Sequence, residues 1–226
     1  MKRKNAQVFL VIPARKAVGL TSVALGLVRT LQRLGVEAGF VKPIAEETPD
    51  RSGYFARQIF QMQVPEALLL QATAERIAAN QTSELLEEIV GLCMKAGEAA
   101  DVLIIEGLHA DESRSFISQI NVDIARSLNA EVIVVADASL DSAFADLRFA
   151  IGQFLNSGCK VAGVVFNKAA EEFDGADAQR RLGKTRLWRV VHDNPILRAP
   201  RTLDVAQHLG AEVVAPGEIG VRRVIQ

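Results

Sequence analysis

The sequence is short of the side chains and segments that several classes of protein need. Only 5% of its residues are aromatic, which argues against a surface that stacks nucleic-acid bases. Its 26 basic and 27 acidic residues leave a formal net charge of −1, so no excess positive charge would attract nucleic acid or an anionic membrane. No apolar run reaches the roughly 20 residues of a membrane-spanning helix. We therefore expect neither nucleic acid nor membrane as a partner.

Cysteine is scarce, and the N-terminus lacks a convincing leader. Cys93 and Cys159 lie far apart in apolar surroundings, so we expect two buried free thiols and no disulfide or cysteine metal site. Basic residues near the start precede an apolar run at 8–13. This run is too short for a signal peptide and is interpreted as the first core strand. The expected location is the cytoplasm.

Apolar residues, in contrast, are plentiful: they make up 49% of the 226 residues, enough for the core of one α/β domain over residues 1–226. Short apolar runs alternate with longer helical patterns, which is typical of a parallel sheet covered by helices. Most runs are rich in Val and Ile without period-two alternation, as expected of strands buried on both faces. The predicted strands are 8–12, 38–42, 102–106, 132–136, 161–166 and 187–191, with a last short one at 212–214.

Apolar residues spaced about 3.6 apart predict the helices between these strands, at 21–34, 82–99, 116–128 and 141–155. The charged, glycine-containing stretch 169–185 is interpreted as an exposed excursion between two strands. Together these patterns predict a three-layer α/β sandwich with a mostly parallel, doubly wound sheet. In such folds ligands bind where the carboxyl ends of the strands meet.

The first predicted strand runs into a loop of the phosphate-binding kind. Its spacing is Ala14-x-x-x-x-Gly19-Leu20-Thr21, against G-x-x-x-x-G-K-[ST] in the P-loop. Gly19 leaves room for backbone N–H groups to turn toward a phosphate, and Thr21 offers a hydroxyl to Mg²⁺. Leu20 replaces the lysine that would neutralise phosphate charge. Efficient phosphoryl transfer is therefore not expected.

Two cations inside the loop, Arg15 and Lys16, are the obvious substitutes for the missing lysine. The predicted anion- or nucleotide-binding residues of this segment are Arg15, Lys16, Val18, Gly19, Leu20, Thr21 and Ser22. The alternative is that the loop merely ends a turn and caps a helix. The loop alone does not decide between these interpretations.

Polar residues also follow the second predicted strand. Lys42 and Pro43 end it, so Lys42 should project over the carboxyl edge of the sheet. Asp50 follows on a loop, where it is available to a cation or a polar ligand. The alternative is a solvated lysine and an aspartate that caps a helix.

Two later strands also end in polar side chains. Glu106 places a carboxylate at the sheet edge, where it could hold Mg²⁺ directly or through water. His109 follows it and is expected to be a surface or supporting residue. Asn167 ends another strand and has the donor–acceptor pair needed to read a purine edge. The alternative for Asn167 is that it satisfies its own turn.

These elements in this order resemble the dethiobiotin synthetase-like branch of P-loop proteins, which build one ATP/Mg²⁺ site from them. The resemblance implies ATP or another nucleotide with Mg²⁺ as the cofactor. It places Thr21, Asp50 and Glu106 at metal-ligand positions. It also assigns Lys42 to substrate and phosphate contact and Asn167 to contact with the base.

A closer resemblance covers nearly the whole chain, from Val8 to Arg223. IPARKAVGLTSVALGLVRTLQRLGVEAGFVKPIA, LIIEGL, NVDIARSLNAEVIVVAD, GVVFNK, APRTLDVAQHLGAEVV and GEIGVRR are similar to the N-terminal domain of the long form of phosphate acetyltransferase. That group carries V-G-L-T-S where active enzymes carry V-G-K-T, so Leu20 is a shared feature. Its parent reaction converts acetyl-CoA and phosphate to acetyl phosphate and CoA. The acetyl-transfer domain is expected to be absent here.

The resemblance implies a non-catalytic regulatory or oligomerisation domain that senses a nucleotide or another small anionic metabolite. Expected partners are a second copy of the chain and a phosphate acetyltransferase catalytic domain. Ala14, Arg15 and Lys16 depart from the pattern and could favour another anion over ATP. One alternative is an ATP/Mg²⁺-dependent carboxylase–ligase of dethiobiotin synthetase type. The other is a pure interaction scaffold with a vestigial site.

Overall fold

The computed structural model describes residues 6–109 and 114–224, without the side chains of residues 197 and 198. The chain forms two compact units, Met1–Val191 and His192–Gln226. All the site residues predicted from the sequence belong to the first unit. The interpretation of residues 1–226 as a single domain stays a prediction.

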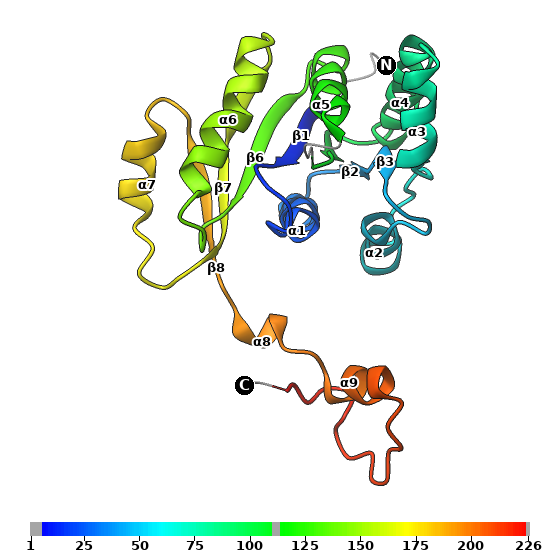
Figure 1. Cartoon of the computed structure of the whole chain (residues 1–226), viewed down its shortest axis with the longest axis vertical. Helices are drawn as coiled ribbons and strands as arrows, with labels where there is room; N and C mark the ends of the chain where they lie inside the picture. Colours follow the sequence, from blue (N-terminus) through cyan, green and yellow to red (C-terminus); the bar gives the residue numbers. More distant parts are fainter. Residues whose placement is uncertain (1–5, 110–113, 225–226) are drawn as a thin grey trace. The chain divides into compact units, whose positions relative to one another are not determined.

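The first unit is built on a six-stranded sheet with the order β2-β5-β1-β6-β7-β8 (Figure 1). The pairs that join β2, β5, β1, β6 and β7 are all parallel. The strands β2 and β5 lie on one side of β1 within the sheet, and the later strands β6, β7 and β8 lie on its other side. The loop after β1 therefore lies at the point where the strand order reverses. The strands are β1 (Gln7–Pro13), β2 (Ala38–Val41), β5 (Val102–Glu106), β6 (Glu131–Asp137), β7 (Lys160–Ala169) and β8 (Leu187–His192).

Six of the seven predicted strands are confirmed, and the seventh is wrong. Residues 212–214 form no strand. Val214 is 92% exposed, and among the described residues no strand pairs with this segment. Its apolar composition suggested a strand. A strand also needs a neighbouring strand that forms hydrogen bonds with its backbone groups, and composition does not indicate whether one is present.

The four predicted helices are confirmed as α1 (Leu20–Arg33), α4 (Thr82–Ala96), α5 (Phe116–Ser127) and α6 (Ala143–Asn156). Sequence reasoning did not place the shorter elements. One of them, α7, lies inside the stretch 169–185 that was interpreted as an excursion. The additional elements are β3 (Ile44–Ala45), α2 (Arg51–Phe60), β4 (Leu68–Leu69), α3 (Leu70–Ala78), α7 (Gly175–Leu182), α8 (Pro195–Arg198) and α9 (Thr202–Leu209). No helix in the described ranges is long and apolar enough to cross a membrane.

Two hydrophobic clusters cover the two faces of the sheet and make the fold a three-layer sandwich. Alternate residues of β1 face opposite ways: Leu10 and Ile12 join one cluster, and Val11 joins the other. The first cluster includes residues of α4, α5 and α6, and the second includes residues of α1 and α2. Figure 1 shows these helices on the two sides of the sheet.

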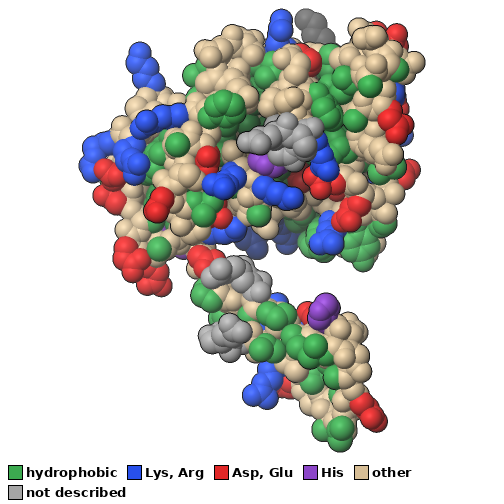
Figure 2. Space-filling model, viewed as in Figure 1, with side chains coloured by type: hydrophobic (Ala, Val, Ile, Leu, Met, Phe, Trp, Pro, Cys, Tyr) green, Lys and Arg blue, Asp and Glu red, His purple; other side chains and the backbone are tan. Residues whose placement is uncertain are grey.

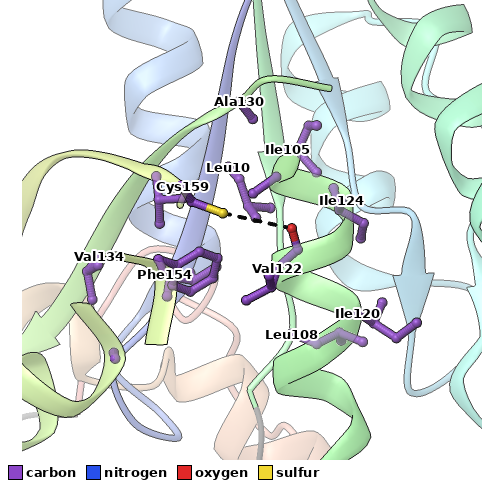
Figure 3. Close-up of a cluster of buried hydrophobic side chains, with 14 of the residues drawn as sticks. Leu10, Ile105, Leu108, Ile120, Val122, Ile124, Ala130, Val134, Phe154 and Cys159 are labelled. Atoms are coloured by element: carbon purple, nitrogen blue, oxygen red, sulfur yellow. Dashed lines mark hydrogen bonds between the residues drawn. The ribbon is translucent and has the colours of Figure 1, made fainter. Parts of the chain in front are cut away.

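Both cysteines are buried and free, as predicted. Burial raises the pKa of the Cys93 thiol to about 12, which leaves it protonated and unreactive near neutral pH. Cys159 lies in the first cluster, where its thiol donates a long hydrogen bond of 4.0 Å to the carbonyl of Val122 (Figure 3). These side chains belong to the core and not to a site.

Candidate functional site

The loop between β1 and α1 starts at Ala14, whose N–H donates to the carbonyl of Val135 at 2.8 Å. Among the described residues, no hydrogen-bond partner is found for the N–H groups of residues 15–19. The next three N–H groups belong to the first turn of α1, where a helix cannot satisfy them internally. Ala17 and Gly19 have left-handed φ values of 63° and 80°. Such alternation turns successive N–H groups to one side and makes a nest for an anion.

Gly19 is required here for two reasons. Its left-handed φ strains any L-residue, and a Cβ at this position would lie 2.4 Å from the amide nitrogen of Asn167. Val18 beside it is 1% exposed and anchors the loop in the second cluster, against which Leu20 also packs. The residue in the lysine position therefore contributes to the core and supplies no charge.

A buried carboxylate lies beside the loop. Strand β5 pairs with β1, with Val11 opposite Glu106, so Glu106 ends the strand next to the loop. Glu106 is 2% exposed. Its Oε1 accepts hydrogen bonds from the hydroxyls of Thr21 at 3.1 Å and Ser52 at 2.8 Å. Its Oε2 is buried and has no hydrogen-bond partner among the residues that the structure describes.

Lys42 is the counter-ion of this carboxylate. Its Nζ donates to Asp50 Oδ1 at 2.9 Å and lies 3.4 Å from Glu106 Oε1. Burial raises the pKa of Glu106, against the opposing effects of the Lys42 charge and the two hydroxyl hydrogen bonds. Burial alone would lower the pKa of Lys42, but the charges of Glu106 and Asp50 together raise it. The ammonium therefore stays protonated between two carboxyl groups.

The residues predicted to hold Mg²⁺ fit that ion. Thr21, Glu106 and Asp50 converge, and all offer the hard oxygen ligands that Mg²⁺ prefers. The orphaned Oε2 of Glu106 is an acceptor that a cation would satisfy. Asp50 also caps α2, because its Oδ2 accepts from the backbone N–H of Gly53 at 2.6 Å. The helix-capping interpretation of Asp50 therefore holds alongside its contact with Lys42.

Strand β7 brings two further side chains to the loop. Asn167 Nδ2 donates to the carbonyl of Val18 at 2.9 Å. Lys168 Nζ donates to the carbonyl of Ala17 at 2.6 Å and to Asp137 Oδ2 at 2.7 Å. In this structure the Asn167 amide contacts the loop backbone, and its contact with a base stays a prediction.

One of the two loop cations, Arg15, is held by the start of α6. Arg15 donates to Ser142 Oγ at 3.0 Å and lies 3.8 Å from Asp146, at the start of α6. Lys16 and Ser22 are exposed. Figure 2 shows basic and acidic side chains interspersed over the face in view, without a large patch of one sign. The contacts of Arg15 are therefore with residues at the start of α6.

A cavity of about 410 Å³ opens beside Lys42. It lies between the start of α2 and the segment that leads to β4. Its lining is Lys42, Thr48, Pro49, Asp50, Gly53, Arg57, Val64, Pro65, Glu66 and Ala67. A small polar ligand in this cavity would reach the same ammonium that contacts Glu106.

Sequence reasoning missed three polar residues of the site. Ser52 lies in the first turn of α2, a helix that the sequence did not predict, two residues after Asp50. The geometry of this helix directs the Ser52 hydroxyl toward Glu106, and no local sequence pattern indicates that contact. Asp137 ends a buried strand, the same signal that identified Glu106, and could have been found. Lys168 follows Asn167, but its partner depends on which strand lies next to β7.

The fold and the site define the class of the protein. The chain has a mostly parallel sheet with helices on both faces, a nest of N–H groups after an inner strand and a buried acidic strand end beside that nest. These are features of P-loop NTPase-type domains. A nucleotide-binding protein from Archaeoglobus fulgidus, solved in complex with ADP, has a similar fold. The TM-score is 0.55 at 14% identity, over 85% of this chain and 84% of that one.

The AAA domain family model matches residues 7–215. Phosphate acetyltransferase of Pseudomonas putida is 36% identical over 96% of this chain and 34% of its own length. That of Deinococcus radiodurans is 36% identical over 94% and 33%. The chain thus spans about a third of the curated relatives that it matches. It belongs to the family of the P-loop-like N-terminal domain of phosphate acetyltransferases, as the sequence predicted.

Proposed function

We propose that this chain is a regulatory domain that binds the phosphate groups of a nucleotide, or of another small anionic metabolite, without transferring them. The observation that carries the proposal is the loop of residues 15–19, whose N–H groups lack partners among the described residues. A row of free donors at a helix N-terminus attracts phosphate. Because a sensor acts by binding one state more tightly than another, turnover is unnecessary.

Mg²⁺ would accompany the nucleotide, with Thr21, Asp50 and Glu106 as its candidate ligands. When bound, it would neutralise part of the phosphate charge. The orphaned oxygen of Glu106 supports this assignment. Lys42, now between Asp50 and Glu106, is placed to contact the phosphate or a second ligand in the adjoining cavity.

The absence of lysine at position 20 argues against phosphoryl transfer, and so against a dethiobiotin synthetase-type carboxylase–ligase. Leu20 packs on the second cluster, so the loop lacks a principal charge clamp for the transition state. The ADP bound by the related fold from Archaeoglobus fulgidus supports a nucleotide as the ligand. Residues for transfer of an acetyl group belong, in this proposal, to a phosphate acetyltransferase catalytic domain. We propose that domain and a second copy of this chain as partners, in the cytoplasm.

A thermal-unfolding panel tests the proposal. The purified chain is unfolded with ATP, ADP, NADH, pyruvate, acetyl-CoA and phosphate, each with and without Mg²⁺. A ligand at about 100 times its Kd should add roughly 2.7 kcal/mol of stability. Glu106→Gln should abolish the Mg²⁺-dependent part of the shift. Glu87→Gln, on the exposed face of α4, is the matched control and should preserve it. If every ligand leaves the unfolding temperature unchanged, the domain is a scaffold.

A further inference from the structure

Two adjacent carbonyls of the loop are each tied to a side chain at the end of β7. Asn167 donates to the carbonyl of Val18, and Lys168 donates to the carbonyl of Ala17. In a trans peptide the carbonyl and the next N–H point in opposite directions within one rigid plane. The two tethers therefore direct the N–H groups of Val18 and Gly19 away from β7. These are donors of the nest, and neither has a partner among the described residues.

Lys168 is itself held firmly. Its ammonium lies 2.7 Å from Oδ2 of Asp137, which is 7% exposed. The other oxygen of Asp137 accepts from the backbone N–H and the hydroxyl of Ser139, at 3.0 and 2.6 Å. The backbone of Lys168 has a left-handed φ of 56°. A non-glycine residue keeps such a conformation only where its surroundings enforce it, and it often marks a functional site.

We propose that Lys168, held by its ion pair with Asp137, is a positioning residue. It preorganises the loop for phosphate and so compensates for the lysine missing at position 20. This inference rests on the proposed phosphate-binding function. A loop whose donors are already aligned loses less conformational freedom on binding, which raises affinity without a new contact. The alternative is that the Lys168–Asp137 pair merely joins β6 to β7.

Isothermal titration calorimetry of the full chain separates these roles. ADP and inorganic pyrophosphate, each with Mg²⁺, are the probes. Lys168→Ala should weaken both by about tenfold or more, the scale of a lost charge-assisted hydrogen bond. Lys168→Arg keeps a donor for both partners and should stay close to wild type. Lys160→Ala, at the exposed opposite end of the same strand, is the matched control and should bind as wild type does.

The double variant Asp137→Ala/Lys168→Ala gives the decisive comparison, because Lys168→Ala alone leaves a buried carboxylate unpaired. Removing both groups should recover unfolding temperature relative to Lys168→Ala, while the affinity for ADP and pyrophosphate stays low. Wild-type affinity in the double variant would overturn the positioning role and leave only a structural tie. If the wild-type chain binds neither probe, the proposed function fails and this inference fails with it.

Discussion

Leu20 and Glu106 are the two residues of the site whose side-chain types are unusual for their positions. Leu20 lies at the position of the P-loop lysine, and its side chain packs against the second hydrophobic cluster. Glu106 is 2% exposed, and one of its carboxyl oxygens has no partner within residues 6–109 and 114–224. A buried oxygen without a partner costs stability in the ligand-free chain, and the proposed Mg²⁺ would remove that cost.

The first prediction at the residue scale concerns pH. Because burial raises the pKa of Glu106 in the folded chain, the folded state binds this proton more tightly than the unfolded state does. The contribution of Glu106 to the free energy of unfolding should therefore fall as pH rises above about 4, the ordinary glutamate pKa. The stability of Glu106→Gln relative to wild type should therefore increase as the pH rises from 4 to 8, because glutamine has no proton to lose.

Urea unfolding at several pH values measures this difference. Glu87→Gln, an exposed change of the same chemistry, controls for general effects of charge. A difference between Glu106→Gln and wild type that stays constant with pH would show that the folded pKa of Glu106 is not raised.

The second residue prediction concerns Leu20→Lys. Removing an apolar side chain that packs on the second cluster should cost about 1–2 kcal/mol of unfolding free energy. The new ammonium should tighten ATP binding by roughly tenfold, because it adds one charge-assisted contact to phosphate. Leu34→Lys, at the 73% exposed end of the same helix, should change neither quantity. Unchanged ATP affinity in a folded Leu20→Lys chain would place the phosphate elsewhere.

At the scale of elements, replacing glycine with alanine should have opposite effects on stability at the start of α1 and in its interior. Gly19→Ala should destabilise by about 1–3 kcal/mol, because of its left-handed φ and the close approach of Asn167. Gly26→Ala, in the same helix with open space around it, should stabilise by roughly 0.5–1 kcal/mol. Chemical denaturation measures both. Equal effects would mean that the loop does not hold Gly19 in this conformation.

The large elements and their polar ends could be predicted because they depend on local patterns. Runs of Val and Ile identified six strands, and a parallel sheet brings the ends of neighbouring strands together, so Glu106 and Lys42 could be placed near Thr21. The segment 212–214 has the same composition but no partner strand, and composition cannot supply one. The contacts of Ser52 and Lys168 depend on an unpredicted helix and on strand order, which no local pattern contains.

At the scale of the whole molecule, the site lies entirely within the first unit. The site residues, from Arg15 in the loop to Lys168 at the end of β7, all precede residue 191. In the second unit no residue of α9 is buried, and apolar side chains such as Leu209 and Val221 are more than 70% exposed. This unit therefore contributes little core of its own.

A chain ending at residue 194 should therefore fold and keep its ligand affinity. It retains all of β8 and every site residue. We expect its far-UV circular dichroism to show a cooperative transition close to that of the full chain, and its affinity for ADP with Mg²⁺ to be unchanged. Loss of cooperative unfolding would show that the second unit supports the sheet after all.

The central claim is that the loop binds phosphate although it lacks lysine. Its most direct test is a calorimetric titration of the wild-type chain with ADP and Mg²⁺, repeated with Gly19→Ala and with Gly26→Ala. We expect saturable binding by wild type and Gly26→Ala. A folded Gly19→Ala should lose at least about tenfold in affinity, because its N–H groups no longer converge. No binding by wild type at millimolar ADP, or equal binding by all three chains, would contradict it.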